Sequence, residues 1–387
     1  MRSSALLGIV VAALAAACSD QSDTTGPSPE FSQQGGASAS DAAHRSGAVY
    51  VLSNDAAANA VLVFARGEDG RLGSPTSIPT GGRGTGAGLG NQGALALDAG
   101  ARRLYAVNAG SDEISAFNVA EGSLRPIQRL GSGGNQPISI ALSDDLLYVL
   151  NDGVTANITG FRVGPDGSLV ALPGSTRQRS APAGAVDGGQ IGFSPDGKTL
   201  LVTEKAANLV VSYPVLPDGR TADPVVTQSN GPTPFGFAFD PKGQTIVAEA
   251  GGGPGGSSVS SYDVEGQSRL RLISGSVGTG QTAACWVAAT SDGRFAYTAN
   301  TGSGTVTGFS VARSGRLQPV TPGGATGTTG AGSGPADLRF SPGNQFLVVR
   351  NGGSRTVSVF STSDNGALTP VGTFAGLPTG TTGLAVR

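Results

Sequence analysis

One phrase recurs seven times along this chain of 387 residues. It consists of an apolar strand, an Asn-rich turn and a second strand with an aromatic residue, as in 147–163 (LYVLNDGVTANITGFRV) and 293–311 (GRFAYTANTGSGTVTGFSV). The aromatic residues that mark the copies are Phe64, Phe117, Phe161, Tyr213, Tyr262, Phe309 and Phe360. A period of about 45–50 residues is typical of propellers built from repeated four-stranded blades.

Each copy contains two further strands. An apolar strand such as QIGFS precedes the phrase and is joined to it by a turn such as SPDG at 194–197. A second Gly turn, such as PDG at 217–219, opens a weaker fourth strand. The 63 glycines of the chain suit so many tight turns, because Gly adopts positive φ freely. The sequence therefore predicts an all-β fold, a seven-bladed β-propeller with four antiparallel strands per blade.

The two ends of the repeated region complement each other. The first copy begins at its second strand, AVYVLS at 48–53, whereas the last residues, TGLAVR at 382–387, resemble a first strand. We expect the C-terminal strand to complete the first blade, which removes the exposed edges of the ring. The propeller should therefore span residues 48–387.

The N-terminus has the features of an export signal. Met1 and Arg2 are followed by an apolar run at 5–17, which is too short to span a bilayer and fits a signal peptide of residues 1–17. Cys18 follows three alanines, in a pattern that resembles a lipoprotein cleavage site, so we expect Cys18 to be lipidated. Residues 18–47 are polar and rich in Ser and Gly, as in a disordered linker. The protein should be an exported bacterial lipoprotein, in the periplasm or at the outer membrane or cell surface.

Charge and cysteine content exclude several function classes. A net charge of −2 gives no footprint for nucleic acid, and we expect membrane contact only through the lipid and a monomeric state. With Cys18 acylated, Cys285 has no partner for an intramolecular disulfide, and its apolar surroundings predict a core residue. The single His, His44, lies in the linker, so no His is available to activate a cysteine nucleophile.

A polar residue recurs where the second strand of each copy ends. It is Asn54, Asn108, Asn151, Glu204, Glu249, Asn300 and Asn351. Asn is common at such positions because it tolerates left-handed backbone and caps its own turn. Glu does neither, so the two Glu copies depart from the repeat on the face that holds the longer loops. This departure marks Glu204 and Glu249 as candidate functional residues, with a solvated turn carboxylate as the alternative.

The segments 193–215 (FSPDGKTLLVTEKAANLVVSYPV), 147–169 and 239–250 (FDPKGQTIVAEA) resemble the bacterial lactonase family of seven-bladed propellers. The resemblance covers about residues 48–387. It implies hydrolysis of sugar-derived lactones, as in the 6-phosphogluconolactonase-type members; the family also includes carboxymuconate cyclases.

The resemblance also implies an active site that uses a His, an Asp and an Arg in a middle blade, then an Arg–His pair and a Glu in the next blade. The matching positions here are Gly189 or Gln190, Glu204, Leu209, Phe235–Gly236 and a residue near Glu249–Gly251. The His and Arg residues of the family are therefore missing. Lactone hydrolysis needs a base and a group that stabilises the oxyanion. Glu204 and Glu249 remain as candidate bases, and Lys205 and Arg350 as candidate cations.

Three functions follow from these observations. The first is a lactonase with a reduced site centred on Glu204 and Glu249, without a cofactor. The second is a non-catalytic propeller that binds a carbohydrate, a peptide or a partner protein of the cell envelope. The third is a metal-assisted lactonase, in which Asn151, Glu204, Glu249 and Asn300 offer oxygen ligands to a divalent cation.

Overall fold

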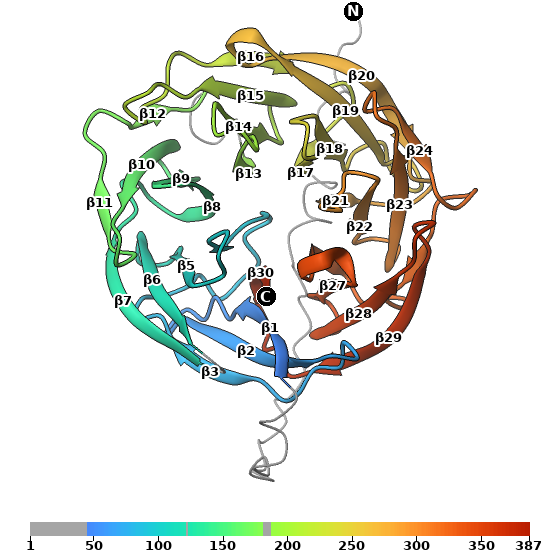
Figure 1. Cartoon of the computed structure of the whole chain (residues 1–387), viewed down its shortest axis with the longest axis horizontal. Helices are drawn as coiled ribbons and strands as arrows, with labels where there is room; N and C mark the ends of the chain where they lie inside the picture. The colour runs from blue at the N-terminus through green and yellow to red at the C-terminus, as the bar shows by residue number, and fades with distance from the viewer. Residues whose placement is uncertain (1–44, 121–122, 181–186) are drawn as a thin grey trace, which may run out of the picture.

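The computed structural model describes residues 45–120, 123–180 and 187–387. They form seven antiparallel sheets arranged as a ring around a central channel (Figure 1). Five sheets have four strands, and two have a fifth short strand beside the third one. This arrangement confirms the predicted seven-bladed propeller.

The strands of each blade run from the channel to the outer rim. The innermost strands are β30 (Thr382–Val386), β4 (Leu95–Leu97), β8 (Pro137–Ser143), β13 (Gly188–Phe193), β17 (Pro234–Phe239), β21 (Ala284–Ala289) and β26 (Pro335–Phe340). The second strands are β1 (Arg45–Leu52), β5 (Arg103–Asn108), β9 (Leu146–Asn151), β14 (Thr199–Glu204), β18 (Thr245–Glu249), β22 (Phe295–Asn300) and β27 (Phe346–Asn351).

The outer half of each blade contains the aromatic marker and the short rim strand. The third strands are β2 (Ala60–Gly67), β6 (Glu113–Ala120), β10 (Asn157–Val163), β15 (Leu209–Pro214), β19 (Ser258–Glu265), β23 (Thr305–Val311) and β28 (Thr356–Thr362). The outermost strands are β3 (Thr76–Pro79), β7 (Ser123–Gly131), β11 (Leu169–Ala171), β16 (Val225–Gln228), β20 (Arg269–Gly278), β24 (Leu317–Pro319) and β29 (Leu368–Ala375). The additional elements are β12 (Arg177–Gln178), β25 (Gly327–Thr328) and two 3₁₀ turns, η2 (Gly266–Ser268) and η3 (Pro342–Asn344).

The core lies between neighbouring blades. All seven aromatic markers are buried, with at most 1% of each residue exposed. Tyrosines of the second strands add polar links, because Tyr148 Oη donates to the carbonyl of Gly219 at 2.9 Å and Tyr297 Oη donates to that of Gly366 at 2.8 Å. Burial raises the pKa of both tyrosines to about 12, so they remain neutral donors.

The C-terminal strand completes the first blade, as the two ends of the sequence predict. β30 pairs antiparallel with β1, with Tyr50 opposite Ala385 and Val51 opposite Leu384. Two backbone hydrogen bonds between Ala48 and Arg387, of 3.1 and 2.8 Å, extend this pairing. β1 begins at Arg45, three residues before the boundary expected from the sequence.

The two ends of the channel open on different faces. We call one of them the loop face. It holds the turns between second and third strands and the connections between blades. The opposite face, with the Pro-Asp-Gly-like turns, is called the hairpin face. Because β1 runs from the hairpin face toward the loop face, the chain before Arg45 joins the propeller on the hairpin face. The signal peptide, Cys18, the linker up to residue 44 and His44 lie outside the described residues.

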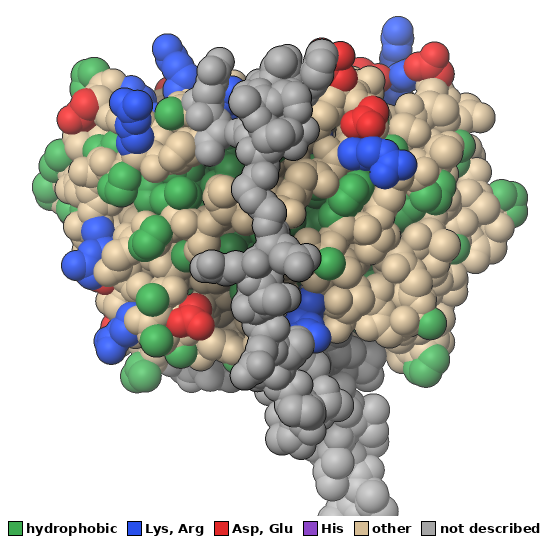
Figure 2. Space-filling view, turned by 90° about the horizontal axis from the view of Figure 1, so that it is seen from below, with side chains coloured by type: hydrophobic (Ala, Val, Ile, Leu, Met, Phe, Trp, Pro, Cys, Tyr) green, Lys and Arg blue, Asp and Glu red, His purple; other side chains and the backbone are tan. Residues whose placement is uncertain are grey.

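The outer surface is mixed in charge. On the side shown in Figure 2, cationic and anionic side chains lie near one another and no extended patch of one sign is visible. Within the described ranges, no helix has the length and apolar character needed to cross a membrane. Cys285 is fully buried, as expected for a core residue, but its sulfur is part of a disulfide, so the expectation of an unpartnered thiol is wrong.

Candidate functional site

A loop of the chain itself closes the channel at the loop face. The Gly-rich connection between β3 and β4 turns inward toward the axis (Figure 1), and its last residues, Leu89–Gly93, lie among the inner strands. We call Leu89–Gly93 the plug. Asn91 and Gln92 at its centre have at most 1% of their surface exposed. A polar loop segment this deeply buried must find hydrogen-bond partners for its groups.

Gln92 finds its partners on four different blades. Its side-chain amide pairs with the backbone of Val287, with Nε2 donating to the carbonyl at 2.9 Å and Oε1 accepting from the N–H at 3.1 Å. Its backbone N–H donates to Gly189 at 3.0 Å and its carbonyl accepts from Ser139 Oγ at 2.6 Å. Nε2 also lies 3.4 Å from Asp337 Oδ1. Gln92 therefore connects blades three, four, six and seven across the channel.

The rest of the plug is held in the same way. The indole N–H of Trp286 donates to the Asn91 carbonyl at 2.7 Å, and Thr382 Oγ1 donates to Asn91 Oδ1 at 2.9 Å. Lys205 Nζ donates to the carbonyl of Gly90 at 2.5 Å. Because Thr382 belongs to β30, the plug and the closure of the ring share a contact.

Among the described residues, Asp337 is the acidic group that contacts the plug directly. It is fully buried on β26 and has a φ of 78°, a backbone conformation that Asp and Asn tolerate better than most residues. Burial raises the pKa of its carboxyl group, although Arg339 and Arg350 act in the opposite direction. Oδ2 accepts no hydrogen bond from the described residues.

The plug lies beside positions that the resemblance assigns to the family's catalytic side chains. Gly189, which with Gln190 matches the family's His, accepts a hydrogen bond from the Gln92 N–H, and Gly236, which with Phe235 matches the Arg–His pair, faces Gln92. A Cβ at position 236 would overlap with Gln92 Oε1, and a Cβ at position 189 would lie 2.6 Å from both Phe235 O and Thr203 Oγ1. Gln190 Oε1 accepts a hydrogen bond from the Phe237 N–H at 2.8 Å. A larger side chain at position 236 therefore cannot fit while the plug is in place.

Glu204, at the end of β14, is fully buried against the segment that follows β12. Its carboxylate accepts from Arg179 Nε at 3.4 Å and from the Ser180 N–H at 3.3 Å, and Ser180 Oγ also donates to it. Arg179 forms a second ion pair with Asp152. The carboxylate therefore joins blades three and four.

Lys205, beside Glu204, points toward the plug. Its ammonium group lies 3.0 Å from Asp187 Oδ1 and 4.5 Å from the centre of the Phe235 ring, in addition to its bond with Gly90. The ion pair and the cation–π contact together compensate the positive charge of the ammonium group. Lys205 thus fastens the plug to blades four and five.

Glu249, at the end of β18, is fully buried and accepts four hydrogen bonds. The donors are Gly231 N–H at 2.8 Å, Ser260 Oγ at 2.6 Å, Ser258 Oγ at 2.5 Å and Ser276 Oγ at 3.1 Å. A carboxylate with this many donors is strongly held in place.

The remaining predicted positions are buried as well. Arg350, on β27, has 2% of its surface exposed and donates to Thr381 Oγ1 at 3.3 Å. All seven residues that end the second strands are fully buried. Asn300, for example, donates to Thr305 Oγ1 at 3.0 Å and Thr307 Oγ1 at 2.9 Å on the next strand. Some of these side chains, such as Asn300, fasten a blade internally, and others, such as Glu204, join two blades. No hydrogen bond or ion pair joins Glu204, Lys205 and Glu249 to one another within the described residues.

The described part of the chain contains no preformed metal site of His, Cys, Asp or Glu ligands. Residues 45–120, 123–180 and 187–387 contain no group of three or more His, Cys, Asp or Glu side chains arranged to hold a metal ion. The metal-assisted lactonase therefore stays a prediction from sequence.

Below the plug, the channel is open toward the hairpin face. Two adjoining cavities of about 500 and 290 Å³ share Gln190, Arg339, Phe340 and Val386 as lining residues. We call this combined space the funnel. Its wall has polar groups as well as apolar ones, and Phe193, Phe239 and Phe340 are partly exposed. Neither the funnel nor Gln92 was singled out by the repeat pattern, because the pattern registers strands and turns and the plug is neither.

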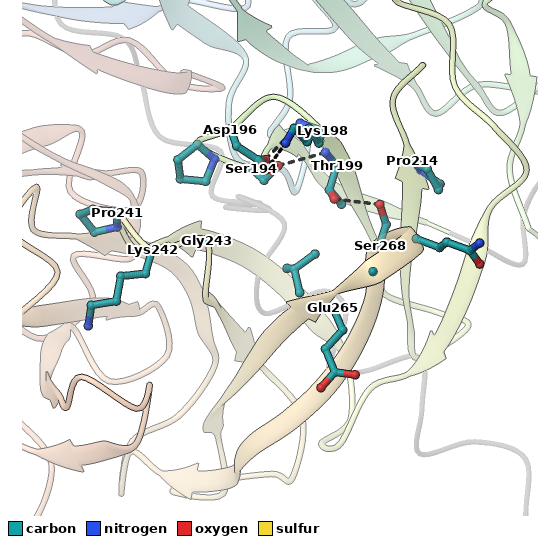
Figure 3. Close-up of a pocket in the computed structure, with 14 residues that line it drawn as sticks. Ser194, Asp196, Lys198, Thr199, Pro214, Pro241, Lys242, Gly243, Glu265 and Ser268 are labelled. Carbon is teal, nitrogen blue, oxygen red and sulfur yellow. Dashed lines mark hydrogen bonds and ion pairs between the residues drawn. The ribbon is translucent and has the colours of Figure 1, made fainter. Parts of the chain in front are cut away.

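A further cavity of about 380 Å³ lies at the rim between the hairpins of blades four and five (Figure 3). Its polar groups bond mainly to one another, since the hydroxyls of Thr199 and Ser268 are 2.8 Å apart and Ser194 Oγ donates to Asp196 at 2.7 Å. Lys242 and Glu265 extend away from this pair (Figure 3). The cavity is a solvent-exposed cleft between two turns.

Comparisons with known proteins agree on the architecture. The sequence model of the family described as "Lactonase, 7-bladed beta-propeller" matches residues 44–178 and 247–381. The periplasmic gluconolactonase PpgL of Pseudomonas aeruginosa is 21% identical, with a TM-score of 0.69 over 88% of this chain and 98% of its own. A Bacteroides fragilis protein provisionally assigned as a 6-phosphogluconolactonase is 18% identical, with a TM-score of 0.66 over 91% and 100%. No curated protein sequence matches the chain significantly.

The solved structures share the fold at low identity, and the sequence model of the family covers well over half of the residues. Together with the seven closed blades, these findings confirm the resemblance read from the sequence: the chain belongs to the lactonase family of seven-bladed β-propellers.

Proposed function

We propose that this chain is a ligand-binding propeller that has kept the lactonase fold without lactone hydrolysis. The observation that carries the proposal is the plug, because Gln92 fills the end of the channel onto which the family's catalytic positions open. Water and a lactone would have to displace a residue that is held by four blades. Such a displacement would leave several buried backbone groups without partners.

The extent of the family match supports the same proposal. The unmatched segment, 179–246, contains Gln190, Glu204, Leu209 and Gly236, which are the positions of most of the implied catalytic residues. Blade four lies outside the match, and blade five lies outside it up to residue 246. Sequence divergence is therefore concentrated where the resemblance places the chemistry.

The surviving candidate residues also support a structural role. A general base needs access to water and a proton affinity suited to the reaction. Glu204 and Glu249 are fully buried, and each accepts three or more hydrogen bonds from the protein. Lys205 is already neutralised by Asp187. We propose that these three side chains hold the loop face together.

Lactone hydrolysis is the competing function, favoured by the family itself. It is tested with purified residues 19–387 and a panel of sugar and alkyl lactones, with and without a chelator, following acid release with a pH indicator. We expect no turnover above that of a heat-denatured sample. Saturable turnover that is lost in Glu204→Gln, while the melting temperature is kept, would contradict the proposal. Loss of turnover with the chelator alone would favour the metal-assisted lactonase.

We further propose that the protein is held at the bacterial envelope by acylation of Cys18, with a small molecule, a carbohydrate or an envelope protein as its partner. Since the chain has two cysteines, a disulfide to Cys285 within one chain and the lipid would compete for the same sulfur. The acylated protein would therefore carry Cys285 as a thiol in place of that disulfide. Partitioning into detergent should be lost in Cys18→Ser. An intact mass without an acyl group would contradict the anchor.

A further inference from the structure

The wall of the funnel has one charged position that breaks the repeat. Each inner strand places one residue opposite the same point of its second strand, as Ala141 lies opposite Tyr148 and Ala288 lies opposite Tyr297. In six blades this residue is small: Ala385, Ala96, Ala141, Gly192, Ala238 and Ala288. In blade seven it is Arg339, opposite Val348.

Arg339 forms no ion pair with a carboxylate among the described residues, and the funnel residues around it are apolar, amide-bearing or hydroxyl-bearing. The acidic group that acts on it is Asp337, two positions earlier, whose side chain is turned to the plug through Gln92. Burial raises the pKa of the Asp337 carboxyl group and so favours its uncharged form. An arginine beside an uncharged carboxyl group is favourable in such a cavity only if water or a bound anion solvates it.

A second donor lies at the roof of the same space. Gln190 lines both cavities, and its Oε1 is occupied by the N–H of Phe237. This bond fixes the orientation of the amide, and Nε2 donates to no described residue. The position of a Cβ built on Gly192 lies 3.8 Å from Nε2, which places this N–H group on the funnel side of the strand. The funnel therefore offers a guanidinium group and an amide N–H to one acceptor.

The rest of the lining determines the body of the ligand. Phe193, Phe239 and Phe340 are only partly buried. The other inner strands contribute Leu97, Leu142, Ala289 and Val386 at the equivalent point. A single cation suits a monoanion, because a dianion such as phosphate would keep an uncompensated charge beside the apolar groups of the wall. The two volumes together are in the range of small-molecule pockets.

We propose that the funnel binds a small organic monocarboxylate with an aromatic or alkyl body, whose carboxylate is held by Arg339 and Gln190. The ligand enters from the hairpin face, because the plug closes the other end of the channel. This inference deepens the proposed binding function by naming the ligand class. The lactone assay and the binding assay below can fail independently, so the two proposals are distinguishable.

The test is titration calorimetry with 4-phenylbutyrate as the probe and residues 19–387 as the protein. We expect saturable binding that weakens by about tenfold to a hundredfold in Arg339→Ala, in line with the loss of a hydrogen bond to a charged group. Uncharged 4-phenylbutyramide should show the same weakening with the unaltered protein. Arg339→Ala introduces the residue that most other blades have, so it should fold, which a thermal melt checks.

The matched control is Arg313→Ala, which removes an exposed cation from a hairpin of blade six on the same face. It should leave the affinity for 4-phenylbutyrate unchanged. Equal affinity in Arg339→Ala, equal affinity for the amide, equal weakening in Arg313→Ala, or no saturable binding at millimolar concentration would each overturn the proposal.

Discussion

The two ends of the channel are built from the same seven inner strands, yet they differ in how far the protein satisfies its own polar groups. At the loop face, Gln92 and Asn91 are buried and bonded to five blades, counting β30 as part of blade one. At the hairpin face, Arg339 and the Gln190 amide line an open space. The first end is closed by intramolecular bonds, and the second keeps capacity for a ligand. The comparison teaches that chemistry in this molecule should be sought away from the family's usual end of the channel.

The largest effect should come from removing residues 382–387, because β30 contributes to both ends of the channel. Thr382 holds Asn91, Leu384 is fully buried and Val386 lines the funnel. We expect the truncated chain to lose its cooperative thermal transition, as measured by circular dichroism. The point variant Leu384→Ala should retain the fold and lose about 2–5 kcal/mol of unfolding free energy. An unchanged melting midpoint in the truncated chain would refute the closure by β30.

A smaller loss is expected for Gln92→Ala, which disrupts only the loop-face end. The backbone N–H and carbonyl of Val287 lose their partners, and each buried unsatisfied group costs about 1–3 kcal/mol unless water replaces the side chain. Urea denaturation measures the change in unfolding free energy. Gln318→Ala is the control, since Gln318 is exposed at the rim of blade six. If both variants are equally stable, the plug does not stabilise the ring. If Gln92→Ala abolishes 4-phenylbutyrate binding, the two ends of the channel are not independent.

The smallest effect, and one of opposite sign, is expected for Asp337→Asn. Because burial raises the pKa of Asp337, the folded state keeps a proton that the unfolded state has already released, in the pH range above the ordinary value of 3.8. Stability from this group therefore falls as the pH rises through that range and stays lower above it. Asn remains neutral and also tolerates the positive φ, so the variant should be the more stable protein at neutral pH. Melting temperatures measured from acid to neutral pH should converge at the acid end; a less stable variant at pH 7 would contradict this account.

The fold was predictable because the same local sequence pattern recurs in every blade. The aromatic marker, the Gly turns and the paired half-blades at the two ends are local patterns, and every one of the seven markers is buried as expected. The candidate site was less predictable. Asn and Glu at the ends of the second strands look like channel ligands in sequence, but side chains such as Glu249 turn into their own blade and bond to Ser258 and Ser260.

The plug and the funnel depend on contacts between residues far apart in the chain. Gln92 and Val287 are 195 positions apart, and no periodicity connects them. One signal was available in the sequence, namely the Gly-rich connection 81–93, which is longer than a blade connection needs to be. Arg339 stands out only when the inner strands are aligned with one another. That alignment needs the strand register, which comes from the structure. Catalytic roles for Glu204, Glu249, Lys205 and Arg350 remain predictions, since buried partners explain their presence without establishing their chemistry.

The strand that completes the first blade also determines when the molecule can fold. Arg66 and Arg387, which contact each other at this seam, are 321 positions apart, so the ring stays unclosed until both segments are available to pair. Contacts of such long range form slowly, because the loop between them must first be ordered. Residues 382–387 therefore act as the latch of the ring, and the first blade stays incomplete until they arrive.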